Sequence, residues 1–179
     1  MKLIPKKLLT VFLITVLITS GFLQTAKVSA FSFQSIEHIK NYYYSNGQNF
    51  SPCSVEFVNT KLWTRYGYKK VFIAIFSTGQ ASTTDVYYKK KNRYKQIYSW
   101  IGFPCMYKNK KYFILNAPDC DAVSFYKFTG TTYQCQTGYE YGSHPEITTK
   151  KSNAILKKFH FPGKEKDYHR LKGNFSMLN

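Results

Sequence analysis

The sequence is poor in acidic residues, because Asp and Glu number 9 among 179 residues while Lys and Arg number 26. An excess of positive charge of this size attracts polyanions and says little about the fold. Beyond the first 30 residues the chain also lacks an apolar run near the length of about 20 residues that a membrane-spanning helix needs. We therefore expect a soluble mature protein without a membrane span, and a negatively charged partner.

Closely spaced cysteine pairs are absent as well. Cys53, Cys105, Cys120 and Cys135 are separated by 52, 15 and 15 positions, whereas structural zinc sites bring their ligands in pairs such as C-x-x-C. We predict no metal and no cofactor. An even number of cysteines in an exported chain favours two disulfides, for which three pairings are open. We prefer Cys105 with Cys120, which would bracket a short hairpin, and Cys53 with Cys135.

No catalytic motif stands out. His144 and Glu146, together with Glu140, place an acid and a base close together in an expected loop, as a small secreted nuclease would need. A solvated turn explains the same residues, since one histidine near two carboxylates arises readily by chance. We predict that the protein is not an enzyme and keep these three residues as weak catalytic candidates.

Residues 1–30 have the pattern of a cleaved signal peptide. Lys2, Lys6 and Lys7 precede an apolar run over 8–22, and Val28 and Ala30 provide small residues at the −3 and −1 positions of a cleavage site. The mature chain would then begin at position 31 and carry 22 basic and 9 acidic residues, a net charge of +13. We expect a secreted protein, held at the cell envelope by its charge, and an uncleaved anchor is the alternative.

The mature chain predicts one short helix followed by strands. Apolar residues recur at helical spacing over 35–45, behind Ser35 as a candidate cap. A short strand is expected over 54–58, and the continuous apolar run over 71–76 is typical of a central strand buried on both faces.

Three hairpins are expected next, and their cross-strand pairs can be named. Strands 85–90 and 93–101 would turn at 91–92, strands 105–108 and 111–116 at 109–110, and strands 122–128 and 132–137 around 129–131. These turns predict the pairs Val86 with Ile97, Tyr88 with Lys95, Tyr107 with Tyr112, and Met106 with Phe113.

The fold class is therefore α+β or mostly β: an antiparallel meander, as an open sheet or a small, partly closed barrel, with one N-terminal helix. We expect a single β-rich domain over 31–160. Its length allows one core of ordinary size. Pro162, Gly163, Gly173 and many charges indicate that 161–179 form a basic, loosely ordered tail.

Aromatic and basic residues alternate along the expected hairpins. Tyrosine rings can stack on sugars or bases while neighbouring cations meet phosphate or carboxylate groups, although an ordinary sheet with one soluble face has the same pattern. We predict that a secreted, non-catalytic protein binds an anionic cell-wall polymer or another polyanion, nucleic acid included. An effector or inhibitor that docks on a protein and a small secreted hydrolase are the alternatives. The predicted binding face contains Tyr88, Lys90, Arg93, Tyr94, Lys95, Lys108, Lys111 and Tyr112.

Overall fold

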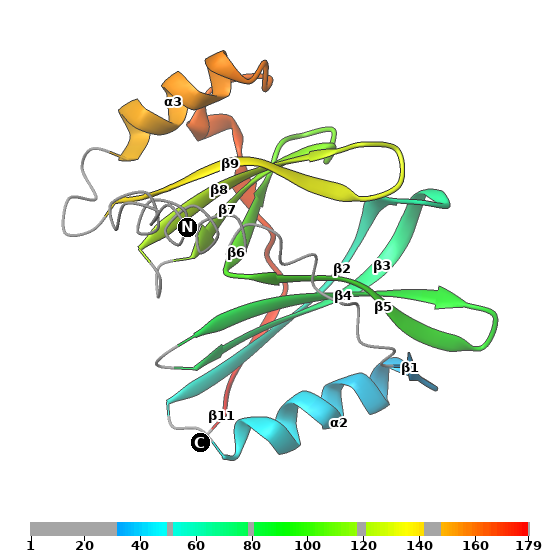
Figure 1. Cartoon of the computed structure of the whole chain (residues 1–179). Helices are drawn as coiled ribbons and strands as arrows, with labels where there is room; N and C mark the ends of the chain where they lie inside the picture. The colour runs from blue at the N-terminus through cyan, green and yellow to red at the C-terminus, as the bar shows by residue number, and fades with distance from the viewer. Residues whose placement is uncertain (1–31, 50–51, 79–80, 118–120, 142–147, 179) are drawn as a thin grey trace, which may run out of the picture.

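The computed structural model, drawn in Figure 1, describes residues 32–49, 52–78, 81–117, 121–141 and 148–178. The first sheet has the strand order β1 (Ser32–Phe33), β5 (Arg93–Ile101), β4 (Ser82–Lys90), β3 (Gly67–Thr78), β2 (Cys53–Thr64), β11 (Asn174–Leu178). The second has the order β10 (His169–Arg170), β6 (Phe103–Met106), β7 (Tyr112–Ala117), β8 (Ala122–Phe128), β9 (Tyr133–Glu140). The helices are α2 (Ile36–Gly47), α3 (Thr148–Lys158) and the 3-10 turn η3 (Glu165–Asp167).

The protein is mostly antiparallel β with one N-terminal helix, as predicted. β2 to β5 and β6 to β9 each form a meander, and both sheets are open within the part of the chain that the structure describes. In Figure 1 the helix α2 lies below the first sheet and α3 lies above the second. The expected architecture is therefore confirmed in its open form.

Three apolar clusters fill the spaces between these layers. The largest joins the two sheets, with Ile73 and Trp100 from the first and Phe113 from the second among its members. A second cluster lies between α2 and the first sheet, and a third packs Leu156 of α3 against the second sheet. The two sheets thus share one core.

The strand β3 is buried on both faces, as its continuous apolar run predicts. Ile73 and Ile75 face the core between the sheets, while Phe72 and Ala74 face α2. β3 nevertheless extends well beyond the apolar run over 71–76, and β2 extends well beyond the expected strand. Both strands continue into a shared hairpin whose outer ends carry polar residues. The strand expected over 54–58 is thus only part of β2.

The helix α2 begins where its cap was expected. The Ser35 hydroxyl accepts a hydrogen bond from the backbone N–H of His38 at 3.2 Å. One turn from its end, Tyr43 is buried, and its hydroxyl donates to a carboxylate oxygen of Asp85 at 2.5 Å and lies 2.7 Å from the Tyr87 hydroxyl. Burial, followed by the charge of Asp85, raises the pKa of Tyr43, so its proton stays in place to hold α2 on the sheet.

The predicted hairpin pairs are confirmed with one exception. Tyr88 pairs with Lys95 and Met106 with Phe113, and the backbone N–H of Tyr107 donates to the Tyr112 carbonyl oxygen at 3.0 Å. Val86, however, pairs with Tyr98 instead of Ile97. A β-bulge between Val86 and Tyr87 inserts one extra residue in β5 and shifts the register beyond it.

The tail expected to be loosely ordered is instead paired with both sheets. β10 pairs with β6 and β11 pairs with β2. Between them, the carboxylate of Glu56 accepts from the Arg170 guanidinium at 2.9 Å and from the backbone N–H of Gly173. Glu56 is buried, so this charged group is satisfied by the tail itself. The prediction failed because the strand partners of the tail lie far away in the sequence: β6 is more than 60 residues before β10, and the paired residues of β2 are more than 110 residues before β11.

The chain crosses from the first sheet to the second at a single glycine. Gly102 has φ of +108°, donates its N–H to the Ser82 carbonyl oxygen at 2.8 Å, and accepts a buried hydrogen bond from the Thr84 hydroxyl at 2.7 Å. A Cβ at this position would lie 2.4 Å from the carbonyl oxygen of Asn116. The crossing therefore requires a residue without a side chain.

Candidate functional site

The turns of four hairpins gather on one side of the molecule, the right-hand side of Figure 1. Side-chain contacts join them. The Trp63 indole N–H donates to the Asn109 carbonyl oxygen at 3.0 Å, the Tyr133 hydroxyl donates to the Lys110 carbonyl oxygen at 2.6 Å, and the rings of Tyr66 and Tyr88 stack 5.4 Å apart. We call segments 59–70, 87–95, 107–112 and 126–133 together the hairpin-tip surface.

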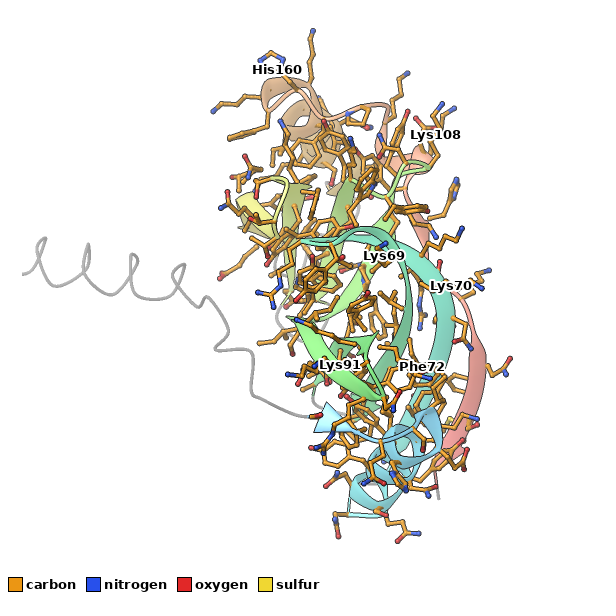
Figure 2. The ribbon with its side chains drawn as sticks, turned by 90° about the vertical axis from the view of Figure 1, so that its right-hand side faces the viewer. Lys69, Lys70, Phe72, Lys91, Lys108 and His160 are labelled. Atoms are coloured by element: carbon orange, nitrogen blue, oxygen red, sulfur yellow. The ribbon has the colours of Figure 1, made fainter. Side chains whose placement is uncertain are left out.

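The hairpin-tip surface carries thirteen cationic residues and no Asp or Glu. Ion pairs between described residues are Lys40 with Glu37 and Arg170 with Glu56, and both lie outside this surface. In Figure 2, which views this side, Lys69 and Lys70 lie between Lys91 below and Lys108 above. The cations are Lys61, Arg65, Lys69, Lys70, Lys89, Lys90, Lys91, Arg93, Lys95, Lys108, Lys110, Lys111 and Lys127.

Tyr66 holds two of these cations. The Arg65 guanidinium lies 4.8 Å and the Lys90 ammonium 5.1 Å from the centre of its ring, and Lys90 also donates a hydrogen bond to the Tyr66 hydroxyl at 3.2 Å. That hydrogen bond lowers the pKa of Tyr66, and Arg65 adds to the effect. With Tyr88 stacked on the same ring, the β2–β3 turn is fixed against the β4–β5 hairpin.

Trp63 likewise holds a cation of the β6–β7 turn over its ring. The Lys111 ammonium lies 4.6 Å from the centre of its ring, and Phe128 and Tyr68 pack against it at 5.9 and 5.3 Å. Beside it, the ammonium of Lys110 donates to the Thr60 hydroxyl, and partial burial lowers the pKa of Lys110. The second sheet thereby presents its turn lysines next to those of the first.

Two turn lysines adopt a backbone conformation that favours glycine. The φ angles of Lys91 and Lys110 are 55° and 52°. A residue with a side chain costs about 1 kcal/mol or more in this region relative to glycine. The chain therefore keeps a charge at the tips of two turns where glycine or asparagine would be less strained.

The predicted binding residues fall into two groups. Tyr88, Lys90, Arg93 and Lys95 lie on one face of the first sheet, because Tyr88 pairs with Lys95 and Lys90 with Arg93. Lys108 and Lys111 lie in the β6–β7 turn, over the rings of Tyr107 and Trp63. Tyr94 pairs instead with Phe33 and packs on the α2 side of the sheet. Tyr112 packs against Phe161 in the cluster under α3.

The sequence reading missed the β2–β3 turn. Arg65 and Tyr66 form this turn, followed by Gly67 with φ of +93°, and Trp63, Tyr68, Lys69 and Lys70 lie on the strands beside it. The signal that could have found the turn is Arg65-Tyr66-Gly67 between two segments that each continue a buried strand. Because this turn was not predicted, Trp63 and Tyr66, which link the β2–β3 turn to the other hairpins, were not identified.

The thiols and the weak catalytic candidates lie elsewhere. Cys53, Cys105 and Cys135 are free thiols on β2, β6 and β9, so the preferred bond between Cys53 and Cys135 is not formed in this structure. Cys120 lies outside the described residues, and its pairing with Cys105 stays a prediction. Cys105 lines a cavity of about 400 Å³ between the second sheet, α3 and η3, and burial raises the pKa of its thiol, which disfavours the reactive thiolate. His144 and Glu146 also lie outside the described residues, and Glu140 is exposed at the end of β9.

Searches for other kinds of site within the described ranges find little. No group of three or more His, Cys, Asp and Glu side chains could hold a metal ion there, and none of the helices placed there has the length and apolar character to cross a membrane. No family model matches the chain, and the comparisons with curated proteins and with solved structures give no match.

Proposed function

We propose that this is a secreted, non-catalytic protein whose hairpin-tip surface binds an anionic polymer at the cell envelope. The observation that carries the proposal is that four separate hairpins, whose turns gather on one side of the fold in Figure 1, carry thirteen cations and no carboxylate in the segments that form these tips. Segments far apart in sequence contribute to it, so it is a property of the folded surface rather than of one basic stretch. Such a surface raises the local concentration of a polyanion.

Like charges also lie directly opposite one another on this surface. Lys61 pairs with Lys70 across β2 and β3, and Lys90 pairs with Arg93 across β4 and β5. Directly opposed like charges destabilise a sheet, and a polyanion that bridges them relieves the repulsion. Together with the strained turn lysines, these pairs support binding over solubility as the reason for the charge, because solubility needs neither.

The proposal predicts a steep salt dependence. Binding to a poly(glycerol phosphate) polymer of the teichoic-acid type should be strong at 50 mM salt and about 1,000-fold weaker at 200 mM, if at least six cations each release a counterion. Replacing Lys90 and Arg93 together should lower the slope of log affinity against log salt by about one to two. Fluorescence anisotropy over a salt series measures both. Absence of binding to this polymer and to heparin at low salt would refute the proposal, and a salt-resistant 1:1 complex with a protein would favour the inhibitor alternative.

Lys91 provides a second test, which separates stability from binding. Lys91→Gly and Lys91→Ala remove the same charge, but only glycine relieves the positive φ. We expect Lys91→Gly to be about 1 kcal/mol more stable than Lys91→Ala in urea unfolding, while both bind the polymer more weakly than wild type by the same factor. Unchanged affinity in both variants would show that the strained lysine is not kept for binding.

A further inference from the structure

The aromatic rings of the hairpin-tip surface are already occupied by the protein. Tyr66 is stacked by Tyr88 and has Arg65 and Lys90 at its ring. Trp63 is packed by Tyr68 and Phe128 with Lys111 over it. Proteins that bind single-stranded nucleic acid need the opposite arrangement, in which successive rings offer free faces to successive bases.

Tyr68 is the exposed ring of this surface, with 41% of its area accessible. One such ring provides one stacking position and cannot form a row. Tyr94, a second tyrosine of the predicted binding face, packs near Phe33 in the apolar cluster under α2 and has Lys89 over its ring at 5.8 Å. The rings of this surface therefore position cations rather than receive bases.

We infer that the ligand is a flexible polymer of phosphate or sulfate groups whose recognition uses no aromatic base. This inference rests on the proposed polyanion binding and narrows its substrate class. The cations held over Tyr66 and Trp63 are partly immobilised before binding, so less side-chain freedom is lost when they meet an anionic group. A polymer with a repeating charge and a flexible backbone can follow cations that come from four hairpins. It needs no aromatic base, because the surface has no row of free rings to fix the orientation of one.

The test compares two probes with the same phosphate spacing: an oligo(dT) of about 20 nucleotides and an abasic oligomer of the same length. At 50 mM salt we expect their affinities to agree within about threefold, whereas one stacked base would favour oligo(dT) by about fivefold or more. Tyr66→Leu should weaken both probes by the same factor, because it removes the ring that positions Arg65 and Lys90. Tyr68→Ala should leave the ratio of the two affinities unchanged.

The outcomes separate this inference from the proposed function. Preference for oligo(dT) by more than about threefold, or a loss of affinity for oligo(dT) alone in Tyr66→Leu, overturns the base-free ligand and leaves polyanion binding in place. Failure of both probes and of poly(glycerol phosphate) overturns polyanion binding and this inference with it. A thermal unfolding curve of Tyr66→Leu, matched to wild type, confirms that the folded protein is being compared.

Discussion

Replacing Gly102 by alanine is expected to lower the free energy of unfolding by about 3 kcal/mol or more. The new Cβ would lie 2.4 Å from the Asn116 carbonyl oxygen and 3.0 Å from the Cα of Ala117, both backbone atoms of β7 that cannot move away alone. Gly102 also has φ of +108°, and its backbone hydrogen bonds to Ser82 and Thr84 hold it there. Relief of the overlap would break the corner that joins the two sheets. Urea unfolding followed by circular dichroism measures the loss.

Gly130→Ala is the matched control, because Gly130 has φ of +99° but no atom within 4 Å of the position of a Cβ. This variant carries the backbone strain without the overlap and lies in an exposed turn, so it should cost only about 1 to 2 kcal/mol. Equal losses of unfolding free energy in the two variants would mean that backbone strain accounts for both, and that the close approach of Gly102 to β7 adds no further cost.

Much of the fold could be predicted because its signals are local. The Ser35 cap, the apolar run of β3 and the turns at Lys91 and Gly130 each specify their element through a few neighbouring residues. The bulge next to Val86 could not be predicted, since the position of an extra residue in one strand is fixed by packing on both faces of the sheet.

The remaining features depend on contacts between distant residues. The tail appeared loosely held because the carboxylate that binds it, Glu56, lies more than 100 positions earlier and reads as one polar residue in a strand. For the same reason the sequence identified the lysines at the β4–β5 and β6–β7 turns but not Trp63 and Tyr66, the rings that join them. Composition predicts how much charge a surface carries, and the topology decides where the charge gathers.

The proposed binding requires that the location of the charge, rather than its amount, sets the affinity for the polymer, and two variants with the same net charge can test this. Replacing Lys69, Lys70, Lys91 and Lys108 by glutamine removes four exposed cations from the hairpin-tip surface. We expect the affinity for poly(glycerol phosphate) at 50 mM salt to fall about 100-fold or more, and the salt slope to fall by roughly three, because each lost contact removes most of one released counterion.

The control replaces four exposed lysines of α3, which lies on the outer face of the second sheet: Lys150, Lys151, Lys157 and Lys158. The net charge falls by the same four units, yet the affinity should change by about fivefold or less, since these cations contribute only a screened field at a distance from the hairpin tips. Similar losses in both variants would mean that the polymer responds to total charge and that the hairpin-tip surface is not a site. A large loss of affinity in the α3 variant alone would show that the binding site lies on that helix. Thermal unfolding of both variants must match wild type, so that a difference in binding reflects the surface and not the fold.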